Sequence, residues 1–208
     1  KPERGALIAQ ILEEVMQPPR SGIAALRGAR RYEAGWRPLP LAPATPVPEG
    51  GTVLITGGFG GIGLTLAEDL ISREGARIAL LARTALPPRA GWPRHLATGG
   101  PLARRIAAVQ RLEALGGQIL VLAGDVSNIE EMQAARTRIE AALGPVTGII
   151  HAAGTIADAP LLAKGPETIE DVFTPKIHGT QVLEQVFPDG DPDWLVLFSS
   201  SSTATAPA

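Results

Sequence analysis

The sequence contains no cysteine in 208 residues, which excludes disulfide bonds, thiolate metal sites and a cysteine nucleophile. This absence fits a reducing compartment, and we expect a cytoplasmic protein. No apolar run approaches the roughly 20 residues needed to span a bilayer, and the opening KPERGALIAQ does not resemble a signal peptide. We therefore expect a soluble chain without a membrane partner.

The sequence also has no large excess of positive or negative charge. The formal net charge is -2, the pI is near 6.0, and no run of Lys and Arg offers a surface that would neutralise a phosphate backbone. Nucleic acid is therefore not an expected partner. The chain is 45% hydrophobic, enough for one substantial core and a small second element. Because it begins at Lys1 and ends in STATAPA, we expect a piece of a longer protein.

The first 48 residues are predicted to form a small segment separate from the rest. Apolar residues recur at helical spacing over 6–16, and the helix should end before the Pro18-Pro19 pair. Residues 23–36, with a turn-like Arg-Gly-Ala in the middle, predict a hairpin that needs a further surface to cover it. Five prolines between 38 and 48 then predict an extended connector, so we place the boundary near Glu49.

Residues 49–208 are predicted to form a doubly wound, parallel α/β sheet. Their strand candidates are apolar without alternation, which is typical of parallel strands covered on both faces. These candidates are 52–56, 77–82, 118–124, 147–154 and 194–200. Helices are predicted over 62–73, 102–115, 130–143 and 168–187, with a cap at Ser127 or Asn128 before the third and at Gly165-Pro166 before the last.

One connection in this region is unusually long. Residues 84–100 span about twice the usual loop length, and loops of that size are either functional or disordered. The sequence leaves both possibilities open.

The stretch TVLITGGFGGIG, residues 52–63, carries the clearest functional signal. A strand passes into glycines and then into an amphipathic helix, and amides at such a helix N-terminus attract a pyrophosphate. Gly57, Gly61 and Gly63 form G-x-x-x-G-x-G after Thr56. This pattern predicts a dinucleotide site, although an ordinary glycine-rich turn is the alternative.

Two residues that follow the next strands bear on which dinucleotide is bound. An acid after the second strand favours NAD, whereas an Arg there favours the extra phosphate of NADP. The sequence has Ala82-Arg83-Thr84, so Arg83 indicates NADPH unless it is simply a solvated side chain. Asp125-Val126 follows the third strand, where an adenine amino group would lie, but Asp125 could equally cap the following helix.

Lys176 is a candidate because of its position in the helix predicted over 168–187. It falls near the middle of an apolar stripe, and lysine seldom lies unpaired on a buried face. The alternative is a lysine whose stem is buried and whose ammonium reaches solvent. His178 falls on the opposite side and is expected to be solvated, while Pro175 should kink or break the helix.

Two further groups follow the fourth and fifth strands. His151 precedes Ala152-Ala153-Gly154, whose small residues would let a nicotinamide ribose approach, and its own role is expected to be structural. Serines 199 to 202 lie at the carboxyl edge where ligands collect in such sheets, although a serine run can also be a polar loop.

TGGFGGIG, Asp125-Val126, HAAG and FSS, in that order, resemble the short-chain dehydrogenase/reductase family with its Rossmann-like fold. Lys176 ahead of Ser200, and RRYEAGW ahead of the prolines, are similar to the ketoreductase domain of modular polyketide synthases. The long LPPRAGW insertion and the PKIHGT stretch are also similar to that domain. The resemblance covers almost the whole chain, with 1–48 matching the end of a structural subdomain and 49–208 a catalytic subdomain.

The resemblance implies NADPH-dependent reduction of a β-ketoacyl chain on an acyl carrier protein to the β-hydroxyacyl chain, beside other domains of a synthase. It implies catalytic roles for Lys176 and Ser200. The implied cofactor-binding residues are Gly57, Gly58, Phe59, Gly60, Gly61, Ile62, Gly63, Ala82, Arg83, Thr84, Asp125, Val126, Ala152, Ala153 and Gly154.

The family's catalytic tyrosine would fall beyond Ala208, and Tyr32, the single tyrosine, does not match its position. We therefore expect the chain alone to bind NADPH without turnover. Ile156-Ala157-Asp158 stands where the family can carry L-D-D, and the retained Asp158 favours a D-configured alcohol. The alternatives are a non-catalytic ketoreductase-fold scaffold and a free-standing short-chain reductase.

Overall fold

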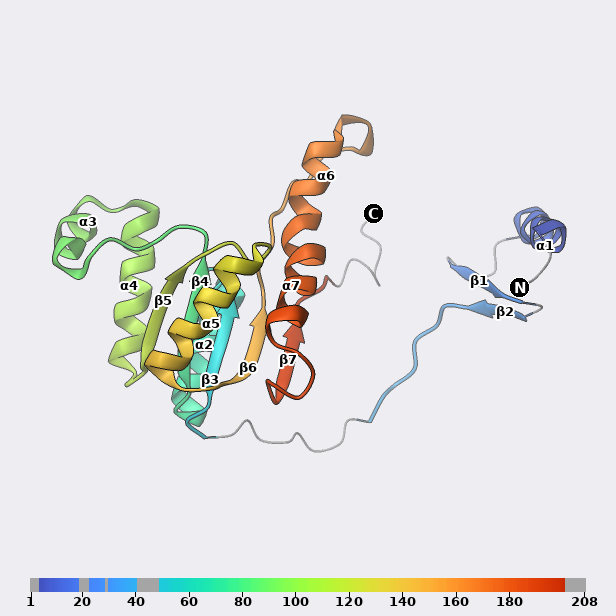
Figure 1. The fold of residues 1–208 in the computed structure, drawn as a ribbon. Helices are drawn as coiled ribbons and strands as arrows, with labels where there is room; N and C mark the ends of the chain where they lie inside the picture. Colours follow the sequence, from blue (N-terminus) through green and yellow to red (C-terminus); the bar gives the residue numbers. More distant parts are fainter. Residues whose placement is uncertain (1–3, 19–22, 29, 41–48, 201–208) are drawn as a thin grey trace. The chain divides into compact units, whose positions relative to one another are not determined.

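The computed structural model describes residues 4–18, 23–28, 30–40 and 49–200 (Figure 1). The chain divides into two compact units, residues 1–45 and residues 46–208. Within the described ranges, no helix is both long and apolar enough to cross a membrane.

The smaller unit contains the predicted helix and hairpin. Helix α1 (Arg4–Met16) precedes strands β1 (Ala24–Arg27) and β2 (Arg30–Glu33), which pair antiparallel. The guanidinium of Arg31 on β2 donates to Glu14 on α1, with Nη2 and Oε1 2.6 Å apart, and this ion pair ties the helix to the hairpin.

The larger unit is built on a five-stranded parallel sheet, which confirms the predicted fold class (Figure 1). Its strands are β3 (Thr52–Thr56), β4 (Arg77–Ala82), β5 (Ile119–Ala123), β6 (Val146–His151) and β7 (Trp194–Leu197), in the order β5-β4-β3-β6-β7. The chain runs outward from β3 to β5 and then returns to β6 on the other side of β3. Ligands of open α/β sheets bind where the strand order reverses in this way.

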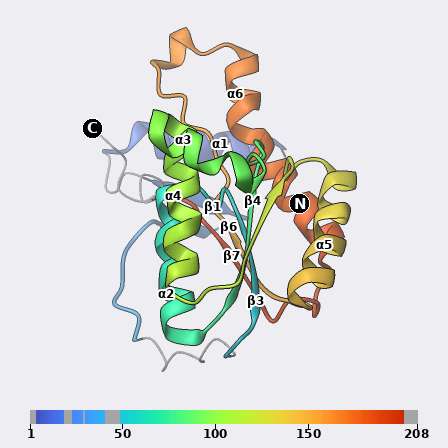
Figure 2. The ribbon, with the colours of Figure 1, turned by 90° about the vertical axis from the view of Figure 1, so that its left-hand side faces the viewer.

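Helices cover both faces of this sheet. Helices α2 (Gly61–Glu74) and α4 (Gly100–Ala114) lie on one face, and α5 (Ile129–Leu143) and α7 (Gly179–Val186) lie on the other (Figure 2). The sheet is therefore the middle of three layers.

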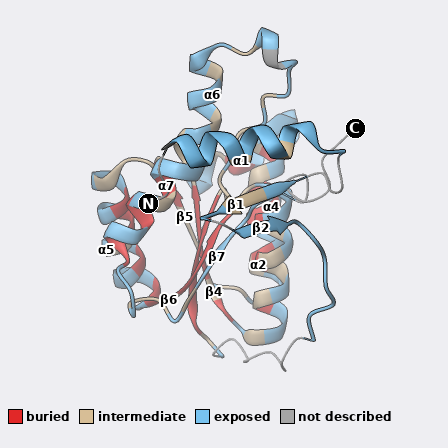
Figure 3. Cartoon of the chain, turned by 90° about the vertical axis from the view of Figure 1, so that its right-hand side faces the viewer, coloured by how far each residue is buried: buried red, intermediate tan, exposed pale blue. Residues whose placement is uncertain are grey.

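The alternation of side chains along β3 explains why its sequence is apolar without a break. Val53 and Ile55 pack into the cluster beneath α2 and α4, whereas Leu54 packs into the cluster beneath α5 and α7. Each is fully buried, and Figure 3 shows the buried residues concentrated on the strands and on the helix sides that face them. Both faces of the strand are thus core.

The ends of two helices have local causes. Helix α2 ends at Gly75, which adopts a φ of 60° that glycine accepts without strain. Helix α5 begins after Asn128, whose side-chain oxygen accepts a hydrogen bond of 3.0 Å from the Glu131 amide. Of the two caps that the sequence offered, Asn128 is the one used.

The helix predicted over 168–187 is continuous but changes type at Pro175. Helix α6 (Pro166–Phe173) leads into a π-helical turn, η3 (Thr174–His178), which leads into α7. Proline lacks the amide that would continue an α-helical ladder, and π-turns accommodate such interruptions. The predicted break at Pro175 therefore takes the form of a wider turn. A short 3-10 helix, η2 (Leu161–Ala163), precedes α6.

The long connection between β4 and α4 is folded rather than irregular. It contains a 3-10 turn, η1 (Arg89–Gly91), and helix α3 (Trp92–Thr98). Trp92 is only 6% exposed, and its indole nitrogen donates to the Pro87 carbonyl at 2.9 Å. Arg89 lies over the Trp92 ring, 4.6 Å from its centre, and also pairs with Glu113 on α4. These contacts fasten the segment to α4.

We predict that Trp92→Ala lowers the free energy of unfolding of the larger unit by about 3 kcal/mol, because it removes a buried aromatic side chain and its hydrogen bond. The measurement is urea unfolding followed by circular dichroism. Trp36→Ala is the matched control, since Trp36 is 83% exposed and its loss should change stability by less than about 0.5 kcal/mol. Equal effects of the two substitutions would contradict the prediction.

Candidate functional site

A cavity of about 540 Å³ lies at the carboxyl ends of the strands, where the strand order reverses. It collects residues from the ends of β3, β4, β5 and β6 and from the π-helical turn. The predicted cofactor-binding residues that line it are Gly57, Phe59, Gly60, Ala82, Arg83, Thr84, Asp125, Val126, Ala152, Ala153 and Gly154. Gly58, Gly61, Ile62 and Gly63 lie in the same loop and helix start, but outside the cavity lining.

The glycine loop allows a close approach of the backbone at Gly57 and leaves open space at Gly61. Gly57 has a φ of 65°, and a Cβ placed there would lie 2.7 Å from the Ala152 carbonyl oxygen. A side chain at Gly57 would therefore separate the end of β3 from the loop after β6. Gly61, the first residue of α2, has no other atoms within 4 Å of a Cβ position and is exposed. An anion can thus reach the free amides at the start of α2.

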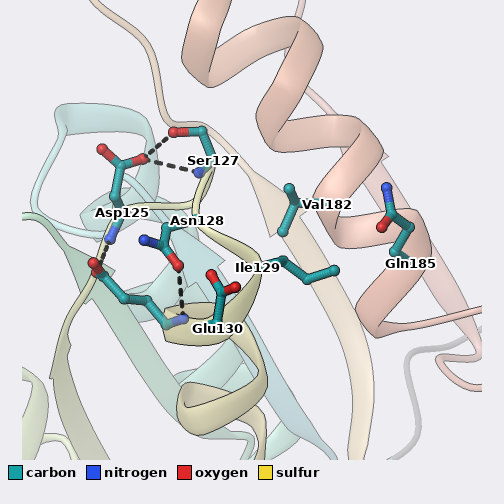
Figure 4. A pocket seen from close by; sticks show the side chains of 8 residues that line it. Asp125, Ser127, Asn128, Ile129, Glu130, Val182 and Gln185 are labelled. Atoms are coloured by element: carbon teal, nitrogen blue, oxygen red, sulfur yellow. Dashed lines mark hydrogen bonds between the residues drawn. The ribbon is translucent and has the colours of Figure 1, made fainter.

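Arg83 and Asp125 form a polar wall of the cavity. The Asp125 carboxylate accepts hydrogen bonds from the Ser127 hydroxyl at 2.6 Å and from the Ser127 amide at 2.9 Å (Figure 4). The Ser127 hydroxyl is the main cause that lowers the pKa of Asp125, and the nearby Arg83 charge acts in the same direction. Asp125 is therefore ionised at neutral pH, and it does not cap α5, because Asn128 does.

A second hollow, of about 600 Å³, opens beside this wall at the start of α5 (Figure 4). Asp125, Ser127 and Glu130 line one side of it, and Val182 and Gln185 of α7 line the other. It shares only Asp125 with the main cavity.

His151, at the end of β6, is buried and fully hydrogen-bonded. Its Nε2 lies 2.9 Å from the Pro175 carbonyl oxygen, and its Nδ1 lies 2.6 Å from the Thr56 hydroxyl. A carbonyl only accepts, so Nε2 carries the proton and Nδ1 accepts from Thr56. Burial lowers the pKa of His151, and the Lys176 charge lowers it further. The neutral ring thus ties β3 and β6 to the π-helical turn.

Lys176 lies in that turn and reaches the loop after β6. A Cβ placed on Gly154 would lie 3.3 Å from the Lys176 Nζ, so the ammonium group lies against the backbone of Gly154. Thr174 and Pro175 of the same turn line the cavity. Lys176 itself is not part of the cavity lining; it lies beside Gly154 after β6, whereas Arg83 follows β4 on the other side of β3.

The apolar stripe predicted around Lys176 is only partly correct. Leu183 is buried as expected, but Lys176 itself is exposed, as are Ile169 and Phe173. The prediction assumed 100° per residue, which the π-helical turn changes, and it placed the whole helix on the sheet. Helix α6 instead extends beyond the strand ends and has no buried residue, so only α7 packs on the sheet (Figure 1). His178 is exposed as predicted and lies near Glu170, with 3.7 Å between nitrogen and oxygen.

Ser200 follows β7 at the same edge of the sheet. The amide of Phe198, two residues earlier, donates to the His151 carbonyl at 3.1 Å, which keeps the chain beside β6 past the end of β7. Ser200 is exposed and is not part of the cavity lining. The remaining serines of the run, 201 and 202, lie outside the described residues.

Sequence reasoning missed a basic residue of the cavity, Arg105 on α4. It lies over the Phe59 ring, with its guanidinium carbon 5.6 Å from the ring centre. No sequence motif predicts this position, because Arg105 is far along the chain from the glycine loop and only the packing of α4 brings it to the cavity. Among the residues that the structure describes, no group of three His, Asp or Glu could hold a metal ion.

We predict that the stability of the larger unit falls as the pH drops from 7.5 to 5.5. The lowered pKa of His151 means that the unfolded state takes up a proton, near the ordinary pKa of about 6.5, before the folded state does. His151→Gln should lower the free energy of unfolding by about 1–3 kcal/mol and flatten this pH dependence. Urea unfolding at several pH values measures both.

His178→Gln is the control for this experiment, because His178 is exposed and its replacement should leave the pH dependence unchanged. A wild-type stability that is constant over this range would overturn the role given to His151, as would flattening by the control variant.

The model of the KR domain family matches residues 51–208. The chain is similar to 6-methylsalicylic acid synthase of Aspergillus terreus (strain NIH 2624 / FGSC A1156), with 39% identity over 79% of this chain and 10% of that protein. The chain thus spans about a tenth of the length of this relative.

Two solved structures share the fold. The crystal structure of an N-terminal ketoreductase from the macrolactin assembly line is 30% identical, with a TM-score of 0.68 over 81% of this chain and 32% of that one. A ketoreductase domain from the bacillaene assembly line is 24% identical, with a TM-score of 0.79 over 98% of this chain and 45% of that one. With the family match over residues 51–208, these similarities show that the chain belongs to the KR domain family of polyketide synthase ketoreductases, within the short-chain dehydrogenase/reductase fold.

Proposed function

We propose that this chain is the NADPH-binding part of a ketoreductase that reduces a β-ketoacyl chain on an acyl carrier protein. The observation that carries the proposal is the cavity at the strand ends. The glycine loop and Arg83 line one part of it, and the turn that holds Lys176 lines another. Family membership supports an oxidoreductase that uses a nicotinamide cofactor.

The residues of the cavity fit a dinucleotide with an extra phosphate. The backbone amides at the start of α2, next to Gly61, would bind the pyrophosphate. The Arg83 guanidinium would bind the extra phosphate on the adenosine ribose. The ionised Asp125 carboxylate is an acceptor for an adenine amino group. Ala152, Ala153 and Gly154 leave room for the nicotinamide ribose. The bound cofactor supplies the hydride.

The substrate side is assigned to Lys176 and Ser200. Ser200 would donate a hydrogen bond to the carbonyl oxygen that becomes the alkoxide, and the Lys176 ammonium would lower the pKa of the tyrosine that protonates it. Lys176 is suited to this task because its charge lies beside Gly154, next to the expected nicotinamide position. Asp158 favours the D-configured alcohol.

The relatives indicate the setting of this reaction. Because the chain covers about a tenth of a synthase such as 6-methylsalicylic acid synthase, we propose that it acts beside other synthase domains and on a carrier protein. Residues 1–48 are assigned to the end of a structural subdomain and residues 49–208 to the catalytic subdomain. The proposed setting is the cytoplasm, with no role in binding nucleic acid.

We predict that the chain binds NADPH at least 10-fold more tightly than NADH, and that Arg83→Ala removes most of this difference. Loss of one charge-assisted contact to phosphate should weaken NADPH binding about 10- to 100-fold and leave NADH unchanged. Fluorescence titration of both cofactors measures the dissociation constants. Arg94→Ala is the control, because Arg94 is exposed and lies outside the cavity lining. Equal binding of the two cofactors by the wild type would overturn the assignment of NADPH.

The 208-residue polypeptide should not reduce a β-ketothioester even when it binds NADPH. The general acid of the reaction is a tyrosine, and Tyr32 in the hairpin unit does not match its position in the family. Consumption of NADPH at 340 nm with a β-ketoacyl thioester measures turnover. Steady reduction by the purified polypeptide would contradict this prediction and would require another proton donor.

A further inference from the structure

Arg105 is the strongest feature of the cavity that the proposed function does not use. It lies on α4, a helix outside the glycine loop, and it lines the same cavity as Arg83 and Thr84. Its neighbour Arg104 is more exposed and is not part of the lining. Of these two adjacent arginines of one helix, only Arg105 lines the cavity, where a bound ligand could reach it.

The Arg105 side chain lies against Phe59. The guanidinium lies over the ring, 5.6 Å from its centre. Phe59 itself packs against the cluster beneath α2 and α4 and against a smaller cluster of Trp92, Ile106 and Val109. A planar guanidinium that stacks on an aromatic ring loses less conformational freedom on binding an anion than a solvated one. Arg105 is thus positioned before any ligand arrives.

The charge of Arg105 is not neutralised by a neighbouring acid. Other arginines close by are paired, Arg89 with Glu113 and Arg111 with Glu68. Among the residues that the structure describes, neither Arg83 nor Arg105 forms an ion pair. Two cations without ion-pair partners among the described residues thus line the same cavity.

The sequence around Arg83 and Arg105 contains more basic than acidic residues. Between Glu74 and Glu113 the chain has no Asp or Glu but seven arginines: Arg77, Arg83, Arg89, Arg94, Arg104, Arg105 and Arg111. Arg89 and Arg111 are paired with glutamates, and Arg77 lies at the opposite end of β4 from the cavity. The remaining arginines give this stretch a local excess of positive charge, which raises the local concentration of anions.

We propose that Arg105 is a second phosphate-binding residue of the cofactor site, which with Arg83 holds the phosphate monoester on the adenosine ribose. A phosphate monoester carries nearly two negative charges at neutral pH and accepts several hydrogen bonds, so two guanidinium groups match it better than one. The inference rests on the proposed binding of NADPH. It adds that cofactor selectivity depends on α4 as well as on the end of β4.

The test compares Arg105→Gln with the matched control Arg104→Gln. Dissociation constants are measured by titration for NADPH, NADH, adenosine 2′,5′-bisphosphate and adenosine 5′-monophosphate. Arg105→Gln should weaken the two ligands with the 2′-phosphate about 10-fold or more and change the other two by less than about twofold. It should also reduce the dependence of NADPH binding on salt. Arg104→Gln should change none of these values.

Three outcomes separate this inference from the proposed function. If the wild type does not prefer NADPH to NADH, the proposed cofactor is wrong. If the wild type prefers NADPH but Arg105→Gln leaves that preference intact, only the role of Arg105 is wrong. If Arg105→Gln weakens NADPH and NADH equally, Arg105 supports the glycine loop instead of binding phosphate, and the inference is again overturned.

A variant that keeps the positive charge separates the loss of a binding contact from a loss of folding. Arg105→Lys retains a cation but not the planar stack on Phe59, so it should bind NADPH more tightly than Arg105→Gln and less tightly than the wild type. The unfolding midpoint of each variant is measured beside the titrations. The proposal would be contradicted if the Lys variant folds but has the same dissociation constants as the Gln variant for all four ligands.

Discussion

The contact between Gly57 and Ala152 is the constraint on which the site depends. These residues end the two strands between which the strand order reverses, and no side chain at Gly57 could fit between them. Their close approach brings the glycine loop and the HAAG segment to one edge of the sheet. The same reversal places the carboxyl ends of β4 and β5 beside them, which is why residues far apart in sequence share one cavity.

His151 connects these strand ends to the π-helical turn that contains Lys176. Its neutral ring accepts from Thr56 on β3 and donates to Pro175 in the π-helical turn, so one buried side chain joins three elements. Pro175 has two effects here: its missing amide widens the helix, and its carbonyl fixes the widened turn against the sheet. The position of Lys176 next to Gly154 follows from both.

Much of the larger unit could be predicted because its signals are local. Unbroken apolar runs predict parallel strands, and the glycine loop predicts the start of α2, so the sheet was predicted correctly. The predicted residues at the strand ends come together in one cavity, and their roles stay predictions. The stripe around Lys176 was partly wrong, because periodicity assumes one helix type and the π-helical turn changes it. The fold of residues 89–98 and the approach of Arg105 to Phe59 depend on how α4 packs, which no local pattern records.

The two arginines of the cavity differ in what each can contribute to selectivity. Arg83 is exposed at the end of β4, where water screens its charge and its side chain must be ordered by the ligand. Arg105 is partly buried and stacked on Phe59, so its charge is less screened and its geometry is already set. The Asp125 carboxylate lies on the same wall of the cavity as Arg83 and is ionised, so it repels an anion that lies close to it. In the proposed complex with NADPH, Arg83 and Arg105 would therefore hold the phosphate, and the Asp125 carboxylate would accept from the adenine amino group.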